Sequence, residues 1–240
     1  MNLTGRTKTG RRPHNEDAYL IANRNGRCFA AVSDGMGGHA AGETASRIAI
    51  DTLDRVLSAA DRIDEAVIRD AFVEANRAVF EAAAADETKH GMGATLVCAV
   101  LNANTFLAAN VGDSRLYQYH EGTIHQVSHD HSFVAELVRR KLITSEEAKS
   151  HPRRNLITRA IGTESSVKVD LFSCEWTKND ILLLCSDGLS GSLGEDELIA
   201  LLNASTDLDE TCAKMIEQAY ENGSTDNITA VLVKNTEDAQ

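Results

Sequence analysis

The stretch DAYLIANRNGRCFAAVSDGMGG, residues 17–38, contains two short apolar runs on either side of a turn. Residues 18–21 and 27–33 have the composition of strands, and the Asn-Gly pair between them is a strong hairpin signal. Two antiparallel strands joined in this way would bring Asp17 and Asp34 to the same end of a sheet. The sequence therefore predicts a pair of carboxylates at a strand end.

Beyond this hairpin, helical and strand-like segments come in separate blocks. Residues 42–59 and 65–85 carry apolar side chains at helical spacing, and we expect two helices in one layer. The strand-like runs that follow have connections too short for crossover helices, so antiparallel pairing is expected. The predicted fold is α+β, a four-layer αββα sandwich of two antiparallel β-sheets flanked by helices. Further strands are expected at 94–101, 105–111, 115–120, 123–128, 167–175, 180–185 and 227–234, and further helices around 133–141, 195–202 and 208–222.

Length and composition limit the possible functions. With 240 residues and 42% hydrophobic content, the chain can bury roughly 70–75% of its unfolded surface. One domain over residues 1–240 is expected, with two small domains as the alternative, and residues 235–240 are expected to form a short polar tail. The formal charge of −12 argues against nucleic acid or an anionic membrane as a partner, because both favour a basic surface.

The cysteines and the apolar runs indicate a soluble, cytoplasmic protein. The five cysteines are odd in number and form no C-x-x-C pair, which favours reduced, buried thiols. No stretch reaches the roughly 18–20 apolar residues of a membrane span. Residues 1–6 lack the apolar core of a signal peptide.

Acidic residues recur in five turns, and apolar runs lead into three of these turns. An Asp beside a Gly or an Asn is ordinary turn chemistry, so no single turn identifies a site. Because strand ends are where a rigid scaffold presents catalytic groups, the five turns together indicate a multi-metal site. The turns are Asn15-Glu16-Asp17, Asp34-Gly35-Met36-Gly37-Gly38, Gly112-Asp113-Ser114-Arg115, Ser186-Asp187-Gly188 and Asp226-Asn227.

The ligand types in these turns favour a particular chemistry. Carboxylate, water and carbonyl oxygens are hard ligands that suit Mg²⁺ or Mn²⁺ and disfavour a Cys/His zinc site. Several carboxylates held together repel one another unless a cation is present. Two ions about 3.5–4 Å apart can bridge a hydroxide, lowering the pKa of its parent water towards about 7, and can clamp a phosphoryl oxygen. Such a centre hydrolyses phosphate esters by in-line attack.

A cationic side chain lies next to the first acidic turn. Arg12 precedes Asn15 by three residues, and a guanidinium can bind two phosphate oxygens at once, whereas a Lys ammonium cannot. Arg11 is the adjacent competitor. A solvated surface charge is the plain alternative for either residue, but the nearby acidic cluster favours a phosphate role for Arg12.

Seven short motifs follow one another along the chain: Arg12-x-x-Asn15-Glu16-Asp17, Asp34-Gly35-Met36-Gly37-Gly38-His39, Gly91-Met92-Gly93-Ala94-Thr95, Ala109-Asn110-Val111-Gly112-Asp113-Ser114-Arg115, Asp130-His131-Ser132, Ser186-Asp187-Gly188-Leu189 and Asp226-Asn227. Their order resembles that of the PPM/PP2C family of metal-dependent protein phosphatases, bacterial type, over nearly the whole chain. The resemblance implies a β-sandwich between helical layers. It also implies Mn²⁺- or Mg²⁺-dependent hydrolysis of phosphoserine and phosphothreonine in proteins.

By this resemblance, four carboxylates and one carbonyl would bind two core ions. Asp17 and Asp34 would bind the pair, with Asp34 bridging the ions and the Gly35 carbonyl contributing to one of them. Asp187 and Asp226 would complete the shell of the second ion.

The same resemblance gives roles to three more residues. Asp113 resembles the ligand of a third, weaker metal site, which it would share with Asp187. Glu16 would hold metal-associated water from outside the metal shell, because strand alternation turns it away from its neighbour Asp17. Arg12 would hold the phosphoryl oxygens of the substrate.

The histidines are expected to have structural roles. Met36 occupies a position where many eukaryotic relatives have a His proposed as general acid, and His39 is three residues farther on. We expect His39 to serve in capping or packing. His125, His129 and His131 lack the spacing of a zinc site, and we expect most of them to be exposed or hydrogen-bonded.

The resemblance also places residues 132–161 as a flap beside the active site. Cations in this segment would either meet an acidic phosphoprotein or remain solvated, and the sequence leaves both interpretations open. The implied partners are phosphorylated proteins and a bacterial serine/threonine kinase of the same pathway, and the protein is expected to be a monomer. The cations are Arg139, Arg140, Lys141, Arg153 and Arg154.

Other classes of protein fit the sequence less well. Residues 35–40 match a G-x-G-x-x-A dinucleotide-binding turn, but a second helix follows where a parallel strand is required, and Asp34 would repel a pyrophosphate. No cysteine has an arginine at the C-x5-R spacing of a cysteinyl-phosphate enzyme. A non-catalytic phosphoprotein-binding module on the same fold is the remaining alternative. Its usual mark is the loss of metal ligands, and every matched ligand is present here.

Overall fold

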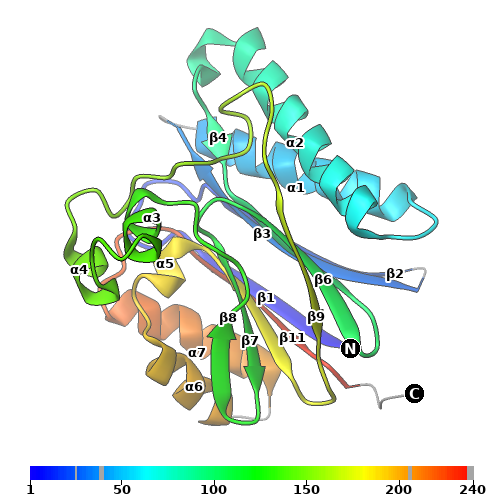
Figure 1. The fold of residues 1–240 in the computed structure, drawn as a ribbon, viewed down its shortest axis with the longest axis vertical. Helices are drawn as coiled ribbons and strands as arrows, with labels where there is room; N and C mark the ends of the chain where they lie inside the picture. The colour runs from blue at the N-terminus through cyan, green and yellow to red at the C-terminus, as the bar shows by residue number, and fades with distance from the viewer. Residues whose placement is uncertain (25, 38–40, 205–206, 237–240) are drawn as a thin grey trace.

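A computed structural model describes residues 1–24, 26–37, 41–204 and 207–236, and eleven strands lie within these ranges (Figure 1). They form two antiparallel sheets, with strand orders β1-β11-β10-β7-β8 and β2-β3-β5-β6-β9, and β4 pairs with β3. The strands are β1 (Asn2–Lys8), β2 (Asp17–Arg24), β3 (Arg27–Met36), β4 (Gly93–Ala94), β5 (Leu96–Leu101), β6 (Thr105–Val111), β7 (Arg115–His120), β8 (Thr123–Gln126), β9 (Asp170–Glu175), β10 (Ile181–Cys185) and β11 (Ile228–Lys234).

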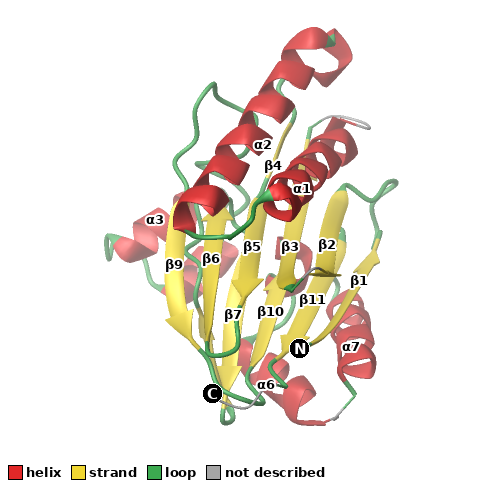
Figure 2. Cartoon of the chain, turned by 90° about the vertical axis from the view of Figure 1, so that its right-hand side faces the viewer, coloured by secondary structure: helices red, strands yellow, loops and turns green. Residues whose placement is uncertain are grey.

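Helices cover the outer face of each sheet, which confirms the predicted αββα layering (Figure 2). α1 (Ala41–Ala59) and α2 (Glu65–Ala85) pack on the six-stranded sheet, and α6 (Glu195–Ala204) and α7 (Leu208–Glu221) pack on the five-stranded sheet. The remaining helices are short: η1 (Glu87–Lys89), α3 (Phe133–Arg139), α4 (Ser145–Ser150) and α5 (Asp187–Ser190).

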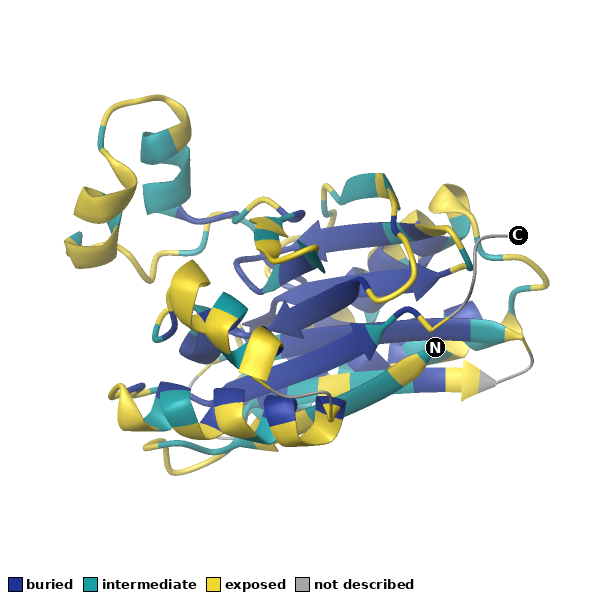
Figure 3. Cartoon of the chain, turned by 90° about the horizontal axis from the view of Figure 1, so that it is seen from below, coloured by how far each residue is buried: buried dark blue, intermediate teal, exposed yellow. Residues whose placement is uncertain are grey.

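The helix α1 packs closely on its sheet because its inner face is built from small and aliphatic residues. Ala45, Ala49, Leu53 and Leu57 follow one another at intervals of four residues, and all four are fully buried. Burying a Leu side chain contributes roughly 1.5–3 kcal/mol. A separate apolar layer fills the space between the two sheets, and the strands β3, β5, β6, β10 and β11 are almost entirely buried (Figure 3).

The hairpin at residues 17–36 has the predicted form. β2 pairs with β3 in antiparallel register, and Asp17 lies directly opposite Asp34. The two carboxylates therefore reach the same end of the sheet, as expected. Asn25 of the turn lies outside the described residues.

Several predicted boundaries were wrong, and one strand was missed. β1 was not predicted, because its sequence is polar and contains Gly5. It forms because it pairs with the apolar β11. Gly5 is needed there because a Cβ at this position would lie 2.7 Å from the Tyr19 ring. The helix predicted at 133–141 ends at Arg139, since Lys141 has a left-handed backbone with φ of 59°.

The strand predicted at 123–128 ends at Gln126, where the backbone N–H groups of Val127 and Ser128 both donate to Leu116 O. The strand predicted at 167–175 begins at Asp170, and the short helices α4 and α5 were not predicted.

The first residue of the predicted polar tail is part of the folded structure. Asn235 is fully buried, and its side chain donates to Ala103 O at 2.9 Å, so this residue is anchored. Thr236 accepts a hydrogen bond from the amino group of Met1, and residues 237–240 are not described. Because Asn235 fixes the end of β11, the prediction of a tail from residue 235 was wrong.

The predicted thiol state agrees with the structure. All five cysteines are free, and four of them are buried, with Cys174 partly exposed. Within the described ranges, no helix is both long and apolar enough to cross a membrane.

Candidate metal centre

Asp17 is anchored across the two sheets. It is the first residue of β2 and is buried. Its Oδ2 accepts hydrogen bonds from Ser186 Oγ at 2.8 Å and from Thr229 Oγ1 at 2.6 Å. Its Oδ1 has no hydrogen-bond partner in the part of the chain that the structure describes. One oxygen is therefore fixed, and the other keeps its lone pairs.

The backbone of Asp34 is clamped by Thr95. Asp34 N donates to Thr95 Oγ1 at 2.8 Å, and Asp34 O accepts from Thr95 N at the same distance. The Thr95 hydroxyl also contacts Ser114 Oγ at 2.7 Å, which joins β3 to the loop after Asp113. Two acidic turns are thus held by one threonine.

The backbone at Gly35 leaves no room for a side chain. A Cβ placed there would lie 2.0 Å from Gly42 O and 2.8 Å from Glu16 O. Gly35 N also donates to Glu16 O at 3.1 Å. The glycine therefore lets β3, the start of α1 and the turn before β2 approach one another beside Asp34.

Glu16 points toward the start of α1. Its carboxylate lies against Gly42 and accepts that residue's backbone N–H, and its own backbone N–H donates to Asn227 Oδ1 at 2.8 Å. Burial raises the pKa of Glu16, and the positive charge of Arg12 opposes this shift.

Asp113 and Asp187 follow the ends of two buried strands, as the sequence predicts. Asp113 lies in the turn after β6, where Gly112 has φ of 108°. Asp187 begins α5 just after β10. No described residue bonds to its buried Oδ1.

Burial is the largest cause of unusual pKa values in this cluster. It raises the pKa of Asp17 to about 7, with the Thr229 and Ser186 hydroxyls opposing the rise. It also raises the pKa of Asp113 to about 7, and the charge of Asp187 adds to this shift.

Mutual repulsion contributes to the remaining shifts. Burial, followed by the charge of Asp17 and then of Asp187, raises the pKa of Asp34 well above its ordinary value. Burial and the charge of Asp226 raise the pKa of Asp187. The carboxylates of all five acidic turns therefore act on one another.

The donor set fits hard divalent cations. Within the described ranges, no three His, Cys, Asp or Glu side chains converge as a ready-made ligand group. A centre of two ions with waters does not require such convergence, because its carboxylates are spread over both ions. The electrostatic interactions among these side chains and the unpaired oxygens of Asp17 and Asp187 indicate where cations would bind. Buried carboxylate oxygens that lack hydrogen-bond donors are suited to a cation.

The structure separates the two candidate arginines. Arg12 Nη2 donates to Asp226 Oδ2 at 2.7 Å, which places its guanidinium at the edge of the cluster. Arg11 turns away, with its guanidinium carbon 5.6 Å from the centre of the Tyr220 ring. Of the two, Arg12 is therefore the one that contacts the acidic cluster.

The Asp130-His131-Ser132 motif supports the turn of Asp113. Asp130 binds the Arg115 guanidinium with both oxygens. His131 Nδ1 accepts from Gly112 N at 3.0 Å, and Ser132 caps α3. His131 is thus hydrogen-bonded, as predicted.

The other histidines agree with the prediction where the structure describes them. His125 and His129 are exposed. His39 lies outside the described residues.

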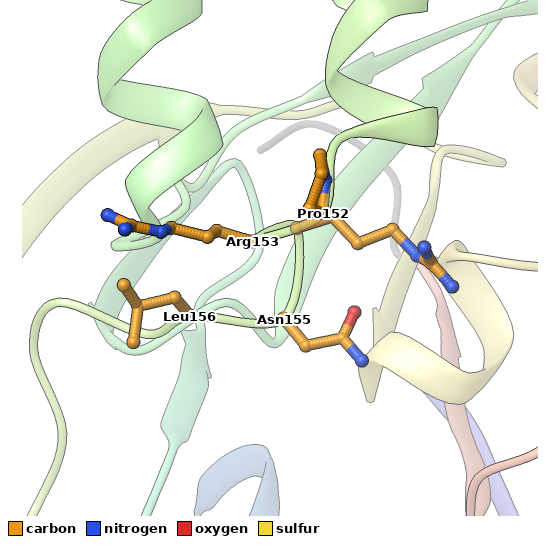
Figure 4. Close-up of a pocket in the computed structure, with 5 residues that line it drawn as sticks. Pro152, Arg153, Asn155 and Leu156 are labelled. Atoms are coloured by element: carbon orange, nitrogen blue, oxygen red, sulfur yellow. The ribbon is translucent and has the colours of Figure 1, made fainter.

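The segment 132–161 contains α3 and α4, at the left edge of Figure 1. A shallow groove of about 410 Å³ lies along the turn that follows α4, and Figure 4 shows Arg153 and Leu156 pointing to the same side of it. The side chain of Asn155 points the other way. The groove is lined by Pro152, Arg153, Arg154, Asn155 and Leu156.

Comparison with known proteins identifies the family. A family model described as protein phosphatase 2C matches residues 4–233. The chain belongs to the protein phosphatase 2C family. Among curated members, the serine/threonine phosphatase stp of Listeria welshimeri is 39% identical over 242 residues, which cover 98% of this chain and 96% of that protein.

Solved structures of the family have the same fold. The serine/threonine phosphatase Stp1 from Staphylococcus aureus is 36% identical, with a TM-score of 0.92 over 97% of this chain and 94% of that one. The catalytic domain of PstP, described in complex with two manganese ions, is 32% identical, with a TM-score of 0.87 over 97% of each chain. The predicted family and the predicted fold are therefore both confirmed.

Two contributors to the site were not singled out by the sequence. Ser186 was quoted only as the neighbour of Asp187, and Thr229 was not named, although both bind Asp17. Their proximity to acidic turns was the available signal. It was weak, because a hydroxyl residue beside an Asp is common in any turn.

Proposed function

We propose that this chain is a metal-dependent protein serine/threonine phosphatase that hydrolyses phosphoserine and phosphothreonine. The observation that carries the proposal is the carboxylate cluster of Asp17, Asp34 and Asp187, in which two buried oxygens are left unpaired among the described residues. Arg12 lies at its edge. Relatives named serine/threonine phosphatases, together with a manganese-bound neighbour, support the same activity.

The acidic turns would hold Mn²⁺ or Mg²⁺, with two core ions and a third. Asp17, Asp34, Asp187, Asp226 and the Gly35 carbonyl would provide the ligands of the core pair. Asp113 and Asp187 would together bind the third ion. Besides burial, which is the larger cause, the charge of Asp187 already raises the pKa of Asp113. When bound, such ions lower the pKa of a neighbouring water and neutralise charge on a phosphoryl oxygen.

The chain's own residues bind and orient the substrate. The Arg12 guanidinium would hold two phosphoryl oxygens, exchanging its present contact with Asp226 for the substrate. Glu16, fixed by the Gly42 N–H, would accept a hydrogen bond from water at the site. The rigid loops that present these groups make the geometry available before the substrate arrives.

The wider setting is also part of the proposal. Residues 132–161 would form a flap, within a single domain over residues 1–240, that contacts the phosphoprotein through its exposed cations. The protein would act as a cytoplasmic monomer in signalling, opposing a bacterial serine/threonine kinase. The abundance of cations on this one segment of an acidic chain supports a contact with an acidic partner.

The test is phosphate release from a phosphothreonine peptide in the presence of EDTA, Mg²⁺ or Mn²⁺, for the wild type and for Asp34→Ala. We expect turnover that requires Mn²⁺ or Mg²⁺ and is lost in the variant. The variant's circular dichroism spectrum and melting curve control for folding. Absence of turnover with every metal would favour the non-catalytic phosphoprotein-binding module.

A further inference from the structure

A chain of hydroxyl groups runs from the surface to Asp17. Asp17 belongs to the six-stranded sheet, but both hydroxyls that bind its Oδ2 come from the five-stranded side: Thr229 from β11 and Ser186 from the end of β10. Ser186 and Thr229 are both fully buried. Water therefore does not compete for these bonds.

The donor directions along this chain follow from the number of protons. An ionised carboxylate only accepts, so Thr229 donates its one hydroxyl proton to Asp17 when Asp17 is ionised, as it would be with a cation bound. Thr229 Oγ1 then accepts from Thr7 Oγ1 at 2.7 Å, and Thr7 Oγ1 accepts from Asn15 Nδ2 at 2.8 Å. Ser186 Oγ donates to Asp17 and accepts Thr229 N–H at 3.1 Å. Every proton along the chain is directed toward one carboxylate oxygen.

The two oxygens of Asp17 are thus in different states. Oδ2 accepts two short hydrogen bonds in a buried setting, where such bonds are strong and mutually polarising. No donor from the described residues reaches Oδ1. The bonds at Oδ2 fix the rotation of the carboxylate, and that rotation sets the direction of the lone pairs on Oδ1.

We infer that Thr229 and Ser186 are positioning residues that orient Asp17 as a one-oxygen metal ligand, with Oδ1 as the ligating atom. This inference rests on the proposed function, because it concerns the same metal centre. Partners that orient a ligand from outside the metal shell typically change metal affinity by about 10- to 100-fold. A purely structural role, joining the two sheets, would change stability and leave metal affinity unaltered.

The experiment measures Mn²⁺ binding to the full-length chain by isothermal titration calorimetry. Thr229→Val removes the hydroxyl and keeps the shape, and Thr229→Ser keeps the hydroxyl. We expect Mn²⁺ to bind about 10- to 100-fold more weakly to Thr229→Val, and close to normally to Thr229→Ser. Thr211→Val is the matched control, because Thr211 of α7 is also buried and its hydroxyl donates to a backbone carbonyl, Asp207 O, just before the helix.

A second variant covers the case in which Thr229→Val does not fold. Ser186→Ala removes the other donor to Asp17 without adding volume, and the same weakening of Mn²⁺ binding is expected. The inference would be overturned if Thr229→Val, Thr229→Ser and Ser186→Ala all bound Mn²⁺ with the affinity of the wild type. Wild-type protein that binds no Mn²⁺ would instead refute the proposed metal centre, so the two failures are distinguishable.

Discussion

Two carboxylates at opposite ends of β10, each with a buried oxygen, have opposite surroundings. Asp180, just before the strand, accepts two hydrogen bonds at each oxygen: Oδ2 from Gln118 and Thr177 N, and Oδ1 from His120 and the Thr177 hydroxyl. Asp187, just after the strand, has a buried Oδ1 with no hydrogen-bond partner among the described residues, and the carboxylates of Asp34 and Asp226 lie close enough to act on it.

This difference separates a structural acid from a functional one. Each donor around Asp180 compensates part of the cost of burying its charge. Around Asp187, burial and the charge of Asp226 both disfavour ionisation. A fold that keeps such a cluster loses stability without a cation. Cation binding therefore best explains the carboxylate cluster around Asp187, which we call the acidic end of β10.

The largest expected effect is on the acidic end. Asp34→Asn should lower phosphopeptide turnover with Mn²⁺ by about 100- to 1000-fold, as for the loss of a group that stabilises transition-state charge. It should also raise the melting temperature in EDTA, because it removes a carboxyl group whose ionisation is disfavoured by burial and by the charges of Asp17 and Asp187. Calorimetry in EDTA and a turnover assay check both. A lower melting temperature in EDTA would contradict the comparison.

The next effect concerns the cation beside this cluster. Arg12→Ala should reduce kcat/KM for a phosphothreonine peptide by about 10- to 100-fold, the equivalent of roughly 1.5–3 kcal/mol for a bond to a charged group. Arg11→Ala is the matched control, and it should change little, because Arg11 faces Tyr220. Similar losses in both variants would show that general positive charge, and not the position of Arg12, matters.

A change at Asp180, before β10, should affect stability and leave turnover unaltered. Asp180→Ala leaves the donors of Gln118, His120 and Thr177 without their acceptor, and should cost about 1–3 kcal/mol in the free energy of unfolding. Urea unfolding measures this loss. Turnover per folded molecule should remain normal, and a large loss of turnover would break the division between the two ends of β10.

The smallest effect is a pH trend. Because the folded-state pKa values of Asp17 and Asp113 are raised from 3.8 to about 7, the folded protein holds protons that the unfolded chain releases between those values. Stability in EDTA should therefore fall as the pH rises from about 4 to above 7. Melting temperatures at several pH values check this, and saturating Mn²⁺ should reverse the trend. A trend that is the same with and without Mn²⁺ would exclude the cluster as its source.

The sequence predicted the hairpin and its consequence correctly. The apolar runs on both sides of the turn set the strands, and antiparallel pairing placed Asp17 opposite Asp34. All four ends of the two long helices were also predicted to within one residue, because the apolar spacing of these helices is regular. Both signals are local, and local signals can be read without knowing the fold.

The missed elements depend on distant partners. β1 has a polar sequence, and it becomes a strand only because Leu3 and its neighbours pair with β11 near the other end of the chain. Asn235 was assigned to a tail because it is polar. It is buried nevertheless, because the carbonyl of Ala103 accepts a hydrogen bond from its side chain. A pairing over such a sequence separation leaves no periodic pattern in either segment.

For the candidate site, the sequence by itself determined which residue types are present and in which turns they lie. Only the tertiary structure decided that Arg12, and not Arg11, faces Asp226, and that Ser186 and Thr229 saturate one oxygen of Asp17. The physical reason is that residue type fixes what a side chain can bind. Which atoms remain unpaired depends on donors that the fold brings from the opposite sheet.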